Sequence, residues 1–179
     1  IIKKFTNKIS DLFADSHISY MQSSGFLSNK KNFSGKTSIL SGPAGGVNAG
    51  IHLAKLNNIN EVIGFDMGGT STDVWHFAGE VEKRLETKIS GIYLKSPVLN
   101  IDSIAAGGGS VISYKQKRFI VGPNSAGAYP GPTCYRNNGP LTITDCNLIL
   151  GRITPDFFPK YFGKNRNQKI SKEFSKKKF

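Results

Sequence analysis

A pair of glycines near the middle of the chain is followed at once by hydroxyl side chains. Gly68 and Gly69 lie inside the segment 62–74, which reads VIGFDMGGTSTDV. Without a Cβ atom, each glycine can adopt a positive φ and lets an anion approach the backbone N–H groups closely. The three residues that follow add side-chain donors at the same place: Thr70, Ser71 and Thr72. This arrangement suits the phosphate groups of a nucleotide.

Two carboxylates, Asp66 and Asp73, flank the glycine turn. Mg²⁺ takes oxygen ligands and keeps several of its waters, so carboxylates beside a phosphate site are what it requires. We therefore expect Asp66 and Asp73 to hold a magnesium ion or its waters next to a nucleotide. The alternative is an ordinary hairpin, because a Gly-Gly pair often joins two strands and Asp and Thr are common turn residues.

Apolar residues on both sides must position this turn. Val62, Ile63 and Phe65 predict a buried strand, and the run 74–78 predicts a second strand that leaves the turn. The turn is not a Walker loop, because no Gly-Lys-Ser/Thr follows, and not a Rossmann fingerprint, because no helix opens at the glycines. The pattern Asp-x-Gly-Gly-Thr-x-Thr-Asp resembles the phosphate-binding hairpin of the actin, sugar-kinase and Hsp70-type ATPase superfamily.

A second glycine cluster follows an apolar segment at 99–110. Gly107, Gly108 and Gly109 let the backbone pass tightly against a ligand or against another segment of the chain. A plain loop is the alternative. Two glycine clusters beside strands in one chain favour a nucleotide site.

A third glycine-rich segment, 38–50, predicts a strand end, a glycine turn and a helix that continues to Leu56. Pro43 fits the first turn of that helix. A helix N-terminus after a glycine turn can bind an anion, but a strand also meets a helix in this way without any ligand.

Periodicity and turn residues predict the other elements of the first half. An amphipathic helix is expected over 1–16, and a short strand over 18–22. A third strand within 81–95 would close an antiparallel meander with the two strands of the glycine hairpin. His76 is next to the candidate site in sequence, but alternation along the strand is expected to turn it away from the phosphates.

The second half is predicted to contain short elements and one long loop. In order, we expect a hairpin at 111–121, a proline-rich loop at 122–135, a strand at 141–144, a helix at 146–150 capped by Asp145, an irregular aromatic stretch at 153–163, and a helix from Ser171 onward. Long loops inside domains are usually functional or disordered, and the prolines here favour a fixed wall of a site.

The charge of the chain is strongly basic. Its 179 residues include 24 Lys and Arg against 12 Asp and Glu, for a net charge of +12. Such a balance invites a nucleic-acid interpretation. However, seven of the basic residues fall within 164–179, and no basic patch is interleaved with aromatic residues. We therefore expect a solvated lysine-rich surface and no nucleic-acid partner.

The remaining composition argues against membranes and disulfides. No apolar run reaches the ~18–20 residues of a membrane-spanning helix, and the first residues lack the features of a signal peptide. We expect a cytoplasmic protein. The two cysteines, Cys134 and Cys146, are too few for a disulfide framework, and their spacing suits no common zinc site. The chain has no initiator Met and is expected to begin within a longer protein.

Five ordered motifs carry a specific resemblance. They occupy residues 38–50, 64–74, 105–110, 121–135 and 141–153. Together they resemble the hydantoinase/oxoprolinase family of ATPases, over residues 18–179. The motifs Phe77-Ala-Gly-Glu80, Ala105-Ala-Gly-Gly-Gly-Ser110 and Cys134-Tyr-Arg136 are most similar to the ATP-dependent 5-oxoprolinases within that family.

The resemblance implies a fold, a reaction and a set of site residues. The fold would be α/β and part of an actin/sugar-kinase/Hsp70-like ATPase fold, with a preceding segment at 1–37, an ATPase-type domain at 38–163 and a basic helix at 164–179. The reaction would open 5-oxo-L-proline to L-glutamate, coupled to hydrolysis of ATP with Mg²⁺. Matching the motifs assigns phosphate contacts to the five residues from Gly68 to Thr72 and the metal to the flanking aspartates. The glycines 107–109 would pass near the nucleotide.

The resemblance also implies partners. Nucleotide sites in this superfamily lie between two similar domains, and only one Asp-x-Gly-Gly-Thr occurs here. The N-terminal domain with the other copy and the lactam-hydrolysing half would have to come from elsewhere, so we expect weak or no ATP turnover by this chain alone. Alternatives are an ATPase subunit of a hydantoinase or ketone carboxylase, and a non-catalytic remnant or binding module.

Overall fold

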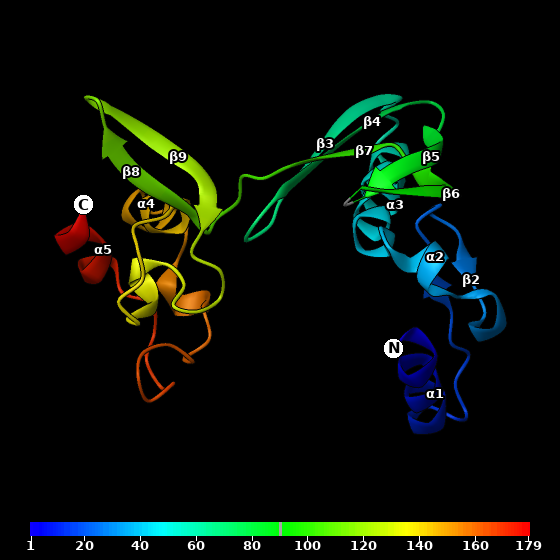
Figure 1. The fold of residues 1–179 in the computed structure, drawn as a ribbon, viewed down its shortest axis with the longest axis horizontal. Coiled ribbons are helices and arrows are strands. Elements are labelled where there is room, and N and C mark those ends of the chain that lie inside the picture. Colours follow the sequence, from blue (N-terminus) through cyan, green and yellow to red (C-terminus); the bar gives the residue numbers. More distant parts are fainter. Residues whose placement is uncertain (90) are drawn as a thin grey trace. The chain divides into compact units, whose positions relative to one another are not determined.

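The computed structural model describes residues 1–89 and 91–179 and divides the chain into two compact units. The first unit comprises 1–65 and 74–102, and the second comprises 66–73 and 103–179. Figure 1 shows the helices and strands of both. The tip of the glycine hairpin therefore belongs to the second unit, although its strands begin and end in the first.

The first unit begins with the predicted amphipathic helix and a small hairpin. The elements are α1 (Ile2–Leu12), β1 (Tyr20–Met21), β2 (Leu27–Ser28), the 3₁₀ helix η1 (Lys30–Asn32) and α2 (Gly35–Ser38). The strands β1 and β2 pair antiparallel around a turn in which Gly25 has a φ of +81°. The ring of Tyr20 stacks on Phe33 with centroids 5.0 Å apart. The strand expected at 18–22 is thus confirmed, as half of a hairpin.

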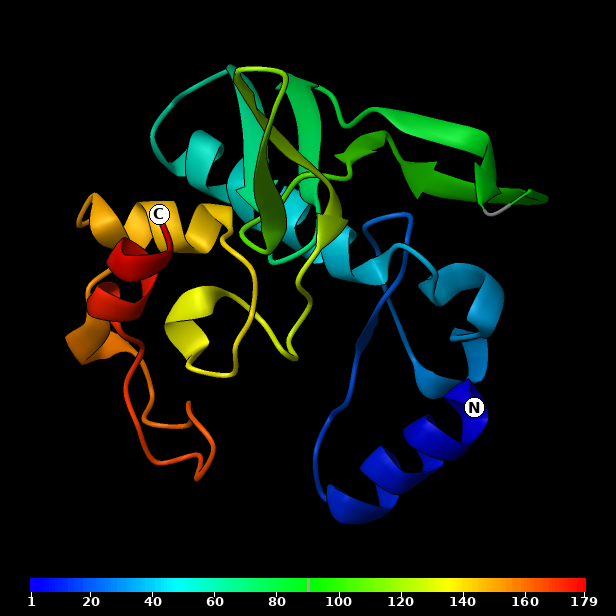
Figure 2. The same ribbon diagram turned by 60° about the vertical axis from the view of Figure 1, so that its left-hand side comes forward.

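A long helix and a three-stranded sheet form the centre of the first unit (Figure 2). The helix is α3 (Ser41–Leu56), and the sheet contains β3 (Glu61–Met67), β4 (Thr72–Ala78) and β7 (Ile101–Ile104) in the order β3-β4-β7. The predicted strand end and glycine turn at 38–50 are wrong, because the helix already begins at Ser41 and runs through the glycines. Pro43 does lie in its first turn.

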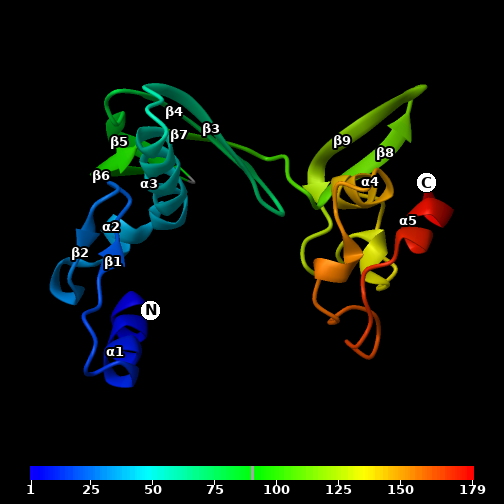
Figure 3. The ribbon, with the colours of Figure 1, turned by 180° about the vertical axis from the view of Figure 1, so that it is seen from behind.

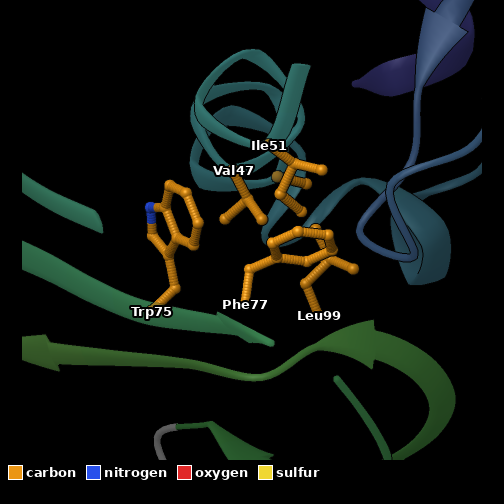
Figure 4. Close-up of a cluster of buried hydrophobic side chains, with 6 residues drawn as sticks. Val47, Ile51, Trp75, Phe77 and Leu99 are labelled. Carbon is orange, nitrogen blue, oxygen red and sulfur yellow. The ribbon is translucent and has the colours of Figure 1, made fainter. Parts of the chain in front are cut away.

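Glycines within α3 and β3 leave room for the indole ring of Trp75, which Figure 4 shows beside α3. A Cβ on Gly50 or on Gly64 would overlap the indole ring of Trp75. The ring is therefore held between the helix and the edge strand, where it is only 8% exposed. Val47, Phe77 and neighbouring apolar side chains complete this core. The contact of α3 with the sheet thus explains glycines that the sequence attributed to a turn.

The strand β3 is not buried, contrary to the sequence prediction. The side chains of Ile63 and Phe65 are 71% and 67% exposed. β3 lies at the edge of the sheet, and α3 covers only the face that carries Trp75 and Phe77. Successive residues of a strand point to opposite faces, so Ile63 and Phe65 point away from the helix.

The predicted meander is also wrong in its third strand. β5 (Lys83–Ile89) and β6 (Ile92–Leu99) pair with each other in a separate antiparallel hairpin. The strand that joins β4 in the sheet is β7, which follows β6 in the chain. Pairing of β5 with β6 has therefore replaced most of the expected pairing of 81–95 with β4, of which the bridge between Phe77 and Val81 is present.

The second unit combines one hairpin with short helices (Figure 3). Its elements are β8 (Ser110–Lys115), β9 (Arg118–Ser125), η2 (Thr133–Tyr135), α4 (Ile143–Ile149), η3 (Pro155–Phe157) and α5 (Lys172–Lys178). Gln116 and Lys117 turn the hairpin with φ of +49° and +60°, which confirms the hairpin predicted there. The helix expected at 146–150 begins three residues earlier, with Thr142 as its N-cap and Asp145 within a capping box.

A buried carboxylate organises this second unit. Asp145 is fully buried and accepts five hydrogen bonds. The donors come from η2, from the start of α4 and from α5, and they are the backbone N–H groups of Thr133, Cys134 and Thr142 and the hydroxyl groups of Thr142 and Ser175. An apolar cluster of Cys134, Leu148 and Ile170 packs beside it.

Candidate functional site

The glycine turn closes a tight hairpin whose tip is exposed. The N–H of Gly68 donates to the carbonyl of Ser71 at 2.9 Å, so Gly69 and Thr70 form the loop between these two residues. Gly68, Gly69 and Thr70 are all exposed. The predicted strand, glycine turn and second strand are therefore confirmed.

The hydrogen bond at the turn also fixes the register of the strands. Continuing this pairing places Gly64 opposite Trp75, and the indole of Trp75 does lie over Gly64. The same register places Asp66 opposite Asp73, on one face of the hairpin. The structure thus brings together the two carboxylates that the sequence singled out on either side of the turn.

The second glycine cluster, residues 107–109, forms hydrogen bonds with the backbone of the hairpin tip. The N–H of Gly108 donates to the carbonyl of Gly68 at 2.9 Å, and the N–H of Gly109 donates to that of Gly69 at 2.6 Å. A Cβ on Gly107 would lie 2.8 Å from the carbonyl oxygen of Gly68. Contacts this close require glycine on the supporting segment. Of the two alternatives that the sequence left open, close approach to another chain segment is the one observed.

The N–H groups of this cluster are therefore used inside the protein. The N–H of Gly107 donates to the Ser110 hydroxyl at 2.9 Å, and its two neighbours donate to the hairpin. None of the three is free to bind a phosphate. The glycines 107–109 therefore hold the hairpin in place through their own N–H groups, and their expected passage near the nucleotide stays a prediction.

The hydroxyl of Thr72 is also used inside the protein. Its hydroxyl donates to the carbonyl of Ala106 at 2.5 Å, and the side chain is only 2% exposed. A hydroxyl group has one proton to donate, so this side chain cannot also donate to a phosphate. Thr72 positions the hairpin against the segment that contains Ala106.

The outer side of the turn retains its donors. Among the hydrogen bonds of the described second unit, the N–H groups of Gly69 and Thr70 donate to no carbonyl. The hydroxyl groups of Thr70 and Ser71 likewise make no hydrogen bond with other described residues of this unit. Because the carbonyls of Gly68 and Gly69 are engaged on the supporting side, the free N–H groups remain on the exposed side. Successive N–H groups of this kind form a concavity that suits an anion.

The two aspartates fit a magnesium ion that keeps most of its water. Asp66 is exposed and Asp73 is half-buried. Like charges placed directly opposite each other on two strands repel, and a divalent cation would relieve that repulsion. No group of three or more His, Cys, Asp or Glu side chains suited to a metal occurs among the described residues. Any ion at Asp66 and Asp73 would therefore take its other ligands from water and phosphate oxygens.

Two positioning residues were missed by the sequence analysis. Ser110 receives the N–H of Gly107, and Thr144 donates to the carbonyl of Gly108 through both its N–H and its hydroxyl, each at 2.8 Å. The position of Ser110 directly after the glycines is a usable signal. Thr144 lies 36 residues from Gly108, and nothing local in the sequence indicates their contact.

His76 has a structural partner. Its Nδ1 lies 2.9 Å from the Oε1 atom of Glu82, and both side chains are about half exposed. This hydrogen bond lowers the pKa of Glu82 below its ordinary value. His76 therefore pairs with a neighbouring carboxylate on the surface, in line with the expectation that it turns away from the phosphates.

The cysteines are held in their thiol form. Cys134 is fully buried, and burial together with the nearby Asp145 carboxylate raises its pKa well above the ordinary range. Burial also raises the pKa of Cys146, which is partly exposed. Thiolate is the reactive form of cysteine, so neither residue is a ready nucleophile.

None of the described helices is both long enough and apolar enough to cross a membrane.

Comparison with known proteins establishes the family. The family model described as hydantoinase/oxoprolinase matches residues 1–179, so the chain belongs to the hydantoinase/oxoprolinase family. The chain is 51% identical, over 185 residues, to a Saccharomyces cerevisiae protein named 5-oxoprolinase. That alignment covers 100% of this chain and 14% of the yeast protein. The resemblance inferred from the motifs is confirmed.

Two solved structures share the fold. A nucleotide-free structure of acetone carboxylase matches with a TM-score of 0.74 and 28% identity, covering 97% of this chain and 25% of that chain. The ATP-dependent caprolactamase from Pseudomonas jessenii matches with a TM-score of 0.69 and 30% identity, covering 96% and 26%. The expected α/β class is confirmed. The chain spans about one seventh of its yeast relative and about a quarter of each of these structures.

Proposed function

We propose that the hairpin tip at Gly68–Ser71 binds the phosphates of MgATP, within an enzyme that opens 5-oxo-L-proline to L-glutamate. The observation that carries this proposal is the division of the turn into two sides. The carbonyls of Gly68 and Gly69 are held by the N–H groups of Gly108 and Gly109, while the N–H groups of Gly69 and Thr70 stay exposed. The turn is therefore preorganised to donate to an anion.

The chain's own residues have distinct tasks in this proposal. The N–H groups of Gly69 and Thr70 and the hydroxyls of Thr70 and Ser71 donate to phosphate oxygens. Asp66 and Asp73 accept hydrogen bonds from the waters of the magnesium ion, or bind the ion directly. Donors that are already in place lose little orientational freedom when the ligand binds. They therefore stabilise the negative charge that develops during phosphoryl transfer.

The bound nucleotide supplies the driving force for a difficult amide hydrolysis. A lactam carbonyl is a poor electrophile, and transfer of the terminal phosphoryl group to its oxygen makes the carbon open to attack by water. Holding the phosphoryl group toward the lactam is chiefly a matter of positioning and charge. The hairpin would contribute one side of that arrangement, and the rest of a longer polypeptide or a partner subunit would contribute the lactam site.

Amide resonances of the labelled chain provide a direct test. We expect MgATP at millimolar concentration to shift the amide signals of Gly69 and Thr70, and we expect a smaller effect from ATP with EDTA. The paired substitutions Asp66→Asn and Asp73→Asn should abolish the difference between these two conditions. The pair Asp11→Asn and Asp15→Asn removes the same two charges from exposed positions far from the turn in sequence and serves as the control.

Two outcomes would contradict this assignment. Gly69 and Thr70 signals that do not move at millimolar MgATP would exclude phosphate binding at the tip. Equal effects of MgATP and of ATP with EDTA in the unsubstituted chain would exclude the metal role of the aspartates.

A second candidate function is ATP-dependent carboxylation of a ketone. It is supported by the match to acetone carboxylase along 97% of the chain. The two functions differ in the substrate that stimulates ATP hydrolysis once the chain is assembled with the remainder of its enzyme. Phosphate release that depends on 5-oxoproline favours the opening of 5-oxoproline. Release that depends on a hydantoin favours the related opening of a hydantoin ring, and release that depends on acetone and bicarbonate favours the carboxylation of a ketone.

A further inference from the structure

The second unit contains a large open groove on segments that the hairpin does not include. Its volume is about 1000 Å³, at the upper end of the range for small-molecule pockets. The walls come from two stretches, 128–138 and 161–166. Its charged and aromatic lining residues are Tyr129, Tyr135, Arg136, Tyr161, Lys164 and Arg166.

The charge of this groove has one sign. Arg136, Lys164 and Arg166 line it, and no Asp or Glu is among its lining residues. None of these three cations takes part in an ion pair with a described residue. Cations that converge without a carboxylate repel one another, and an anion in the groove would relieve this repulsion.

One of the cations is fixed in direction. The Nε of Arg136 donates to the carbonyl of Lys169 at 2.9 Å, and its guanidinium lies over the ring of Phe174 with 5.0 Å to the centroid. These two contacts, with residues beside the groove, restrict the movement of the side chain, and its terminal nitrogens donate to no other described residue of the second unit. A guanidinium held in this way is suited to bind a carboxylate or phosphate group through two parallel hydrogen bonds.

The aromatic residues offer flat surfaces beside the cations. Tyr135 and Phe162 pack against each other with centroids 4.4 Å apart, and the N–H of Gly163 donates to the carbonyl of Tyr135 at 3.0 Å. Tyr129 and Tyr161 are 83% and 74% exposed. Exposed rings that flank a cationic groove can stack on a planar ligand.

Three non-glycine residues of the lining adopt left-handed conformations. Arg136, Asn138 and Arg166 have φ of +65°, +58° and +49°. Such conformations are uncommon outside glycine, and they cluster at binding sites because the surrounding structure must hold them. Here they lie on both walls of the groove.

We propose that this groove binds a small organic anion that carries a planar ring together with a phosphate or carboxylate group. The cations of both walls bind the anionic group, and the exposed tyrosines stack on the ring. This site is separate from the glycine hairpin in its residues and in its need for a metal ion, since no acidic side chain lines it.

Adenosine monophosphate in EDTA is a suitable probe, because it contains both features and the chelator removes magnesium. We expect titration of the labelled 179-residue chain to shift the amide signals of Asn138 and Gly163, with Gly69 unchanged. Adenosine supplies the ring without the anion, and inorganic phosphate supplies the anion without the ring. Each of these should bind at least about tenfold more weakly than the monophosphate.

Charge-removing variants locate the site. The exposed pair Lys164→Gln and Arg166→Gln should weaken binding of the monophosphate by roughly tenfold or more. The pair Lys115→Gln and Arg118→Gln removes the same two residue types from the β8–β9 turn and should leave binding unchanged. Both pairs replace exposed side chains, so folding can be verified from the unchanged amide spectrum elsewhere.

The proposal is overturned by any of three results. These are an absence of shifts at Asn138 and Gly163 at millimolar monophosphate, equal affinity for adenosine and its monophosphate, and equal loss of binding in the two variant pairs. Shifts confined to Gly69 would assign the binding to the hairpin instead.

Discussion

The carboxylate of Asp145 is the residue whose loss should damage the second unit most. It accepts hydrogen bonds from the N–H groups of Thr133, Cys134 and Thr142 at 3.1, 2.8 and 2.9 Å. The hydroxyl of Ser175 in α5 donates to it at 2.7 Å. The substitution Asp145→Ala removes the acceptor and leaves the buried N–H groups of Cys134 and Thr142 without a partner, whereas the N–H of Thr133 also donates to the carbonyl of Pro140 at 3.1 Å.

The size of the effect follows from those donors. Each buried N–H that loses its acceptor costs roughly 1–3 kcal/mol. Two of them give a loss of at least about 2 kcal/mol, before any cost of the cavity is added. Because whole domains are stable by only about 5–15 kcal/mol, this loss is a large share of the free energy of unfolding.

Urea unfolding followed by far-ultraviolet circular dichroism measures the loss. Amide hydrogen exchange at Cys134 and Thr142 should accelerate by about 25-fold or more, since each 1.4 kcal/mol is a factor of ten. The substitution Asp145→Asn keeps the volume but places an NH₂ donor against other donors, so it should also destabilise strongly. The control is Asp156→Ala, which removes an exposed carboxylate that pairs only with Lys169.

A small effect would refute the reasoning. If Asp145→Ala lowered stability no more than Asp156→Ala does, the buried donors would have found other partners, and the carboxylate would not organise the unit. A large effect of the alanine variant with none from Asp145→Asn would assign the loss to the cavity and not to the hydrogen bonds.

Three further predictions concern the glycines, one ion pair and one thiol. Gly107→Ala should weaken MgATP binding and destabilise the chain by roughly 1–3 kcal/mol, because its Cβ would press on the hairpin backbone. Gly45→Ala, in open space within α3, should stabilise the chain by about 0.5–1 kcal/mol. Unfolding in urea measures both changes in stability, and changes of the same sign would contradict the packing argument. His76→Ala should raise the pKa of Glu82 toward its ordinary value of 4.5. Because the pKa of Glu82 is lowered in the folded state, the stability contributed by its pairing with His76 is present above pH 4.5. This stability is lost as the pH falls through the folded pKa of Glu82. A carbon-detected titration of the carboxyl group follows the change. Alkylation of Cys146 in the native chain should be slower at pH 7 than that of a free cysteine and should accelerate as pH rises, because burial raises its pKa; mass spectrometry of the labelled peptide measures this, and a rate equal to that of free cysteine would contradict it.

The parts of the fold that depend on neighbouring residues were predictable. The strands on either side of Gly68 and Gly69, the hairpin turned at Gln116 and Lys117, and the helix capped by Ser171 each follow from a short pattern. In each case the residues that define the element also supply its turn or cap.

The parts that depend on distant contacts were not predictable. The glycines of α3 indicated a turn in the sequence, because the reason for Gly50 is an indole 25 residues further along the chain. The third strand of the sheet was misplaced for the same reason, since β7 reaches β4 only after the β5–β6 hairpin has been completed. Tertiary packing overrides local propensity in both places.

The candidate site shows the same division. The types of its residues identified the turn and the flanking aspartates, but they could not separate donors that face outward from those used inside. Thr72 and the glycines 107–109 had the right chemistry for a phosphate and are occupied by Ala106, Ser110 and the hairpin itself. Only the hydrogen-bond partners distinguish a binding residue from a positioning residue here.

The placement of Trp75 has a practical consequence. It is the only tryptophan of the chain, and it is enclosed between a glycine of α3 and a glycine of β3. Its fluorescence therefore monitors one contact alone, the seating of the helix on the edge strand, without any label or substitution. A red shift of the emission would signal that water has entered between these two elements, and the tyrosines of the second unit would leave that signal undisturbed when excitation is restricted to the indole.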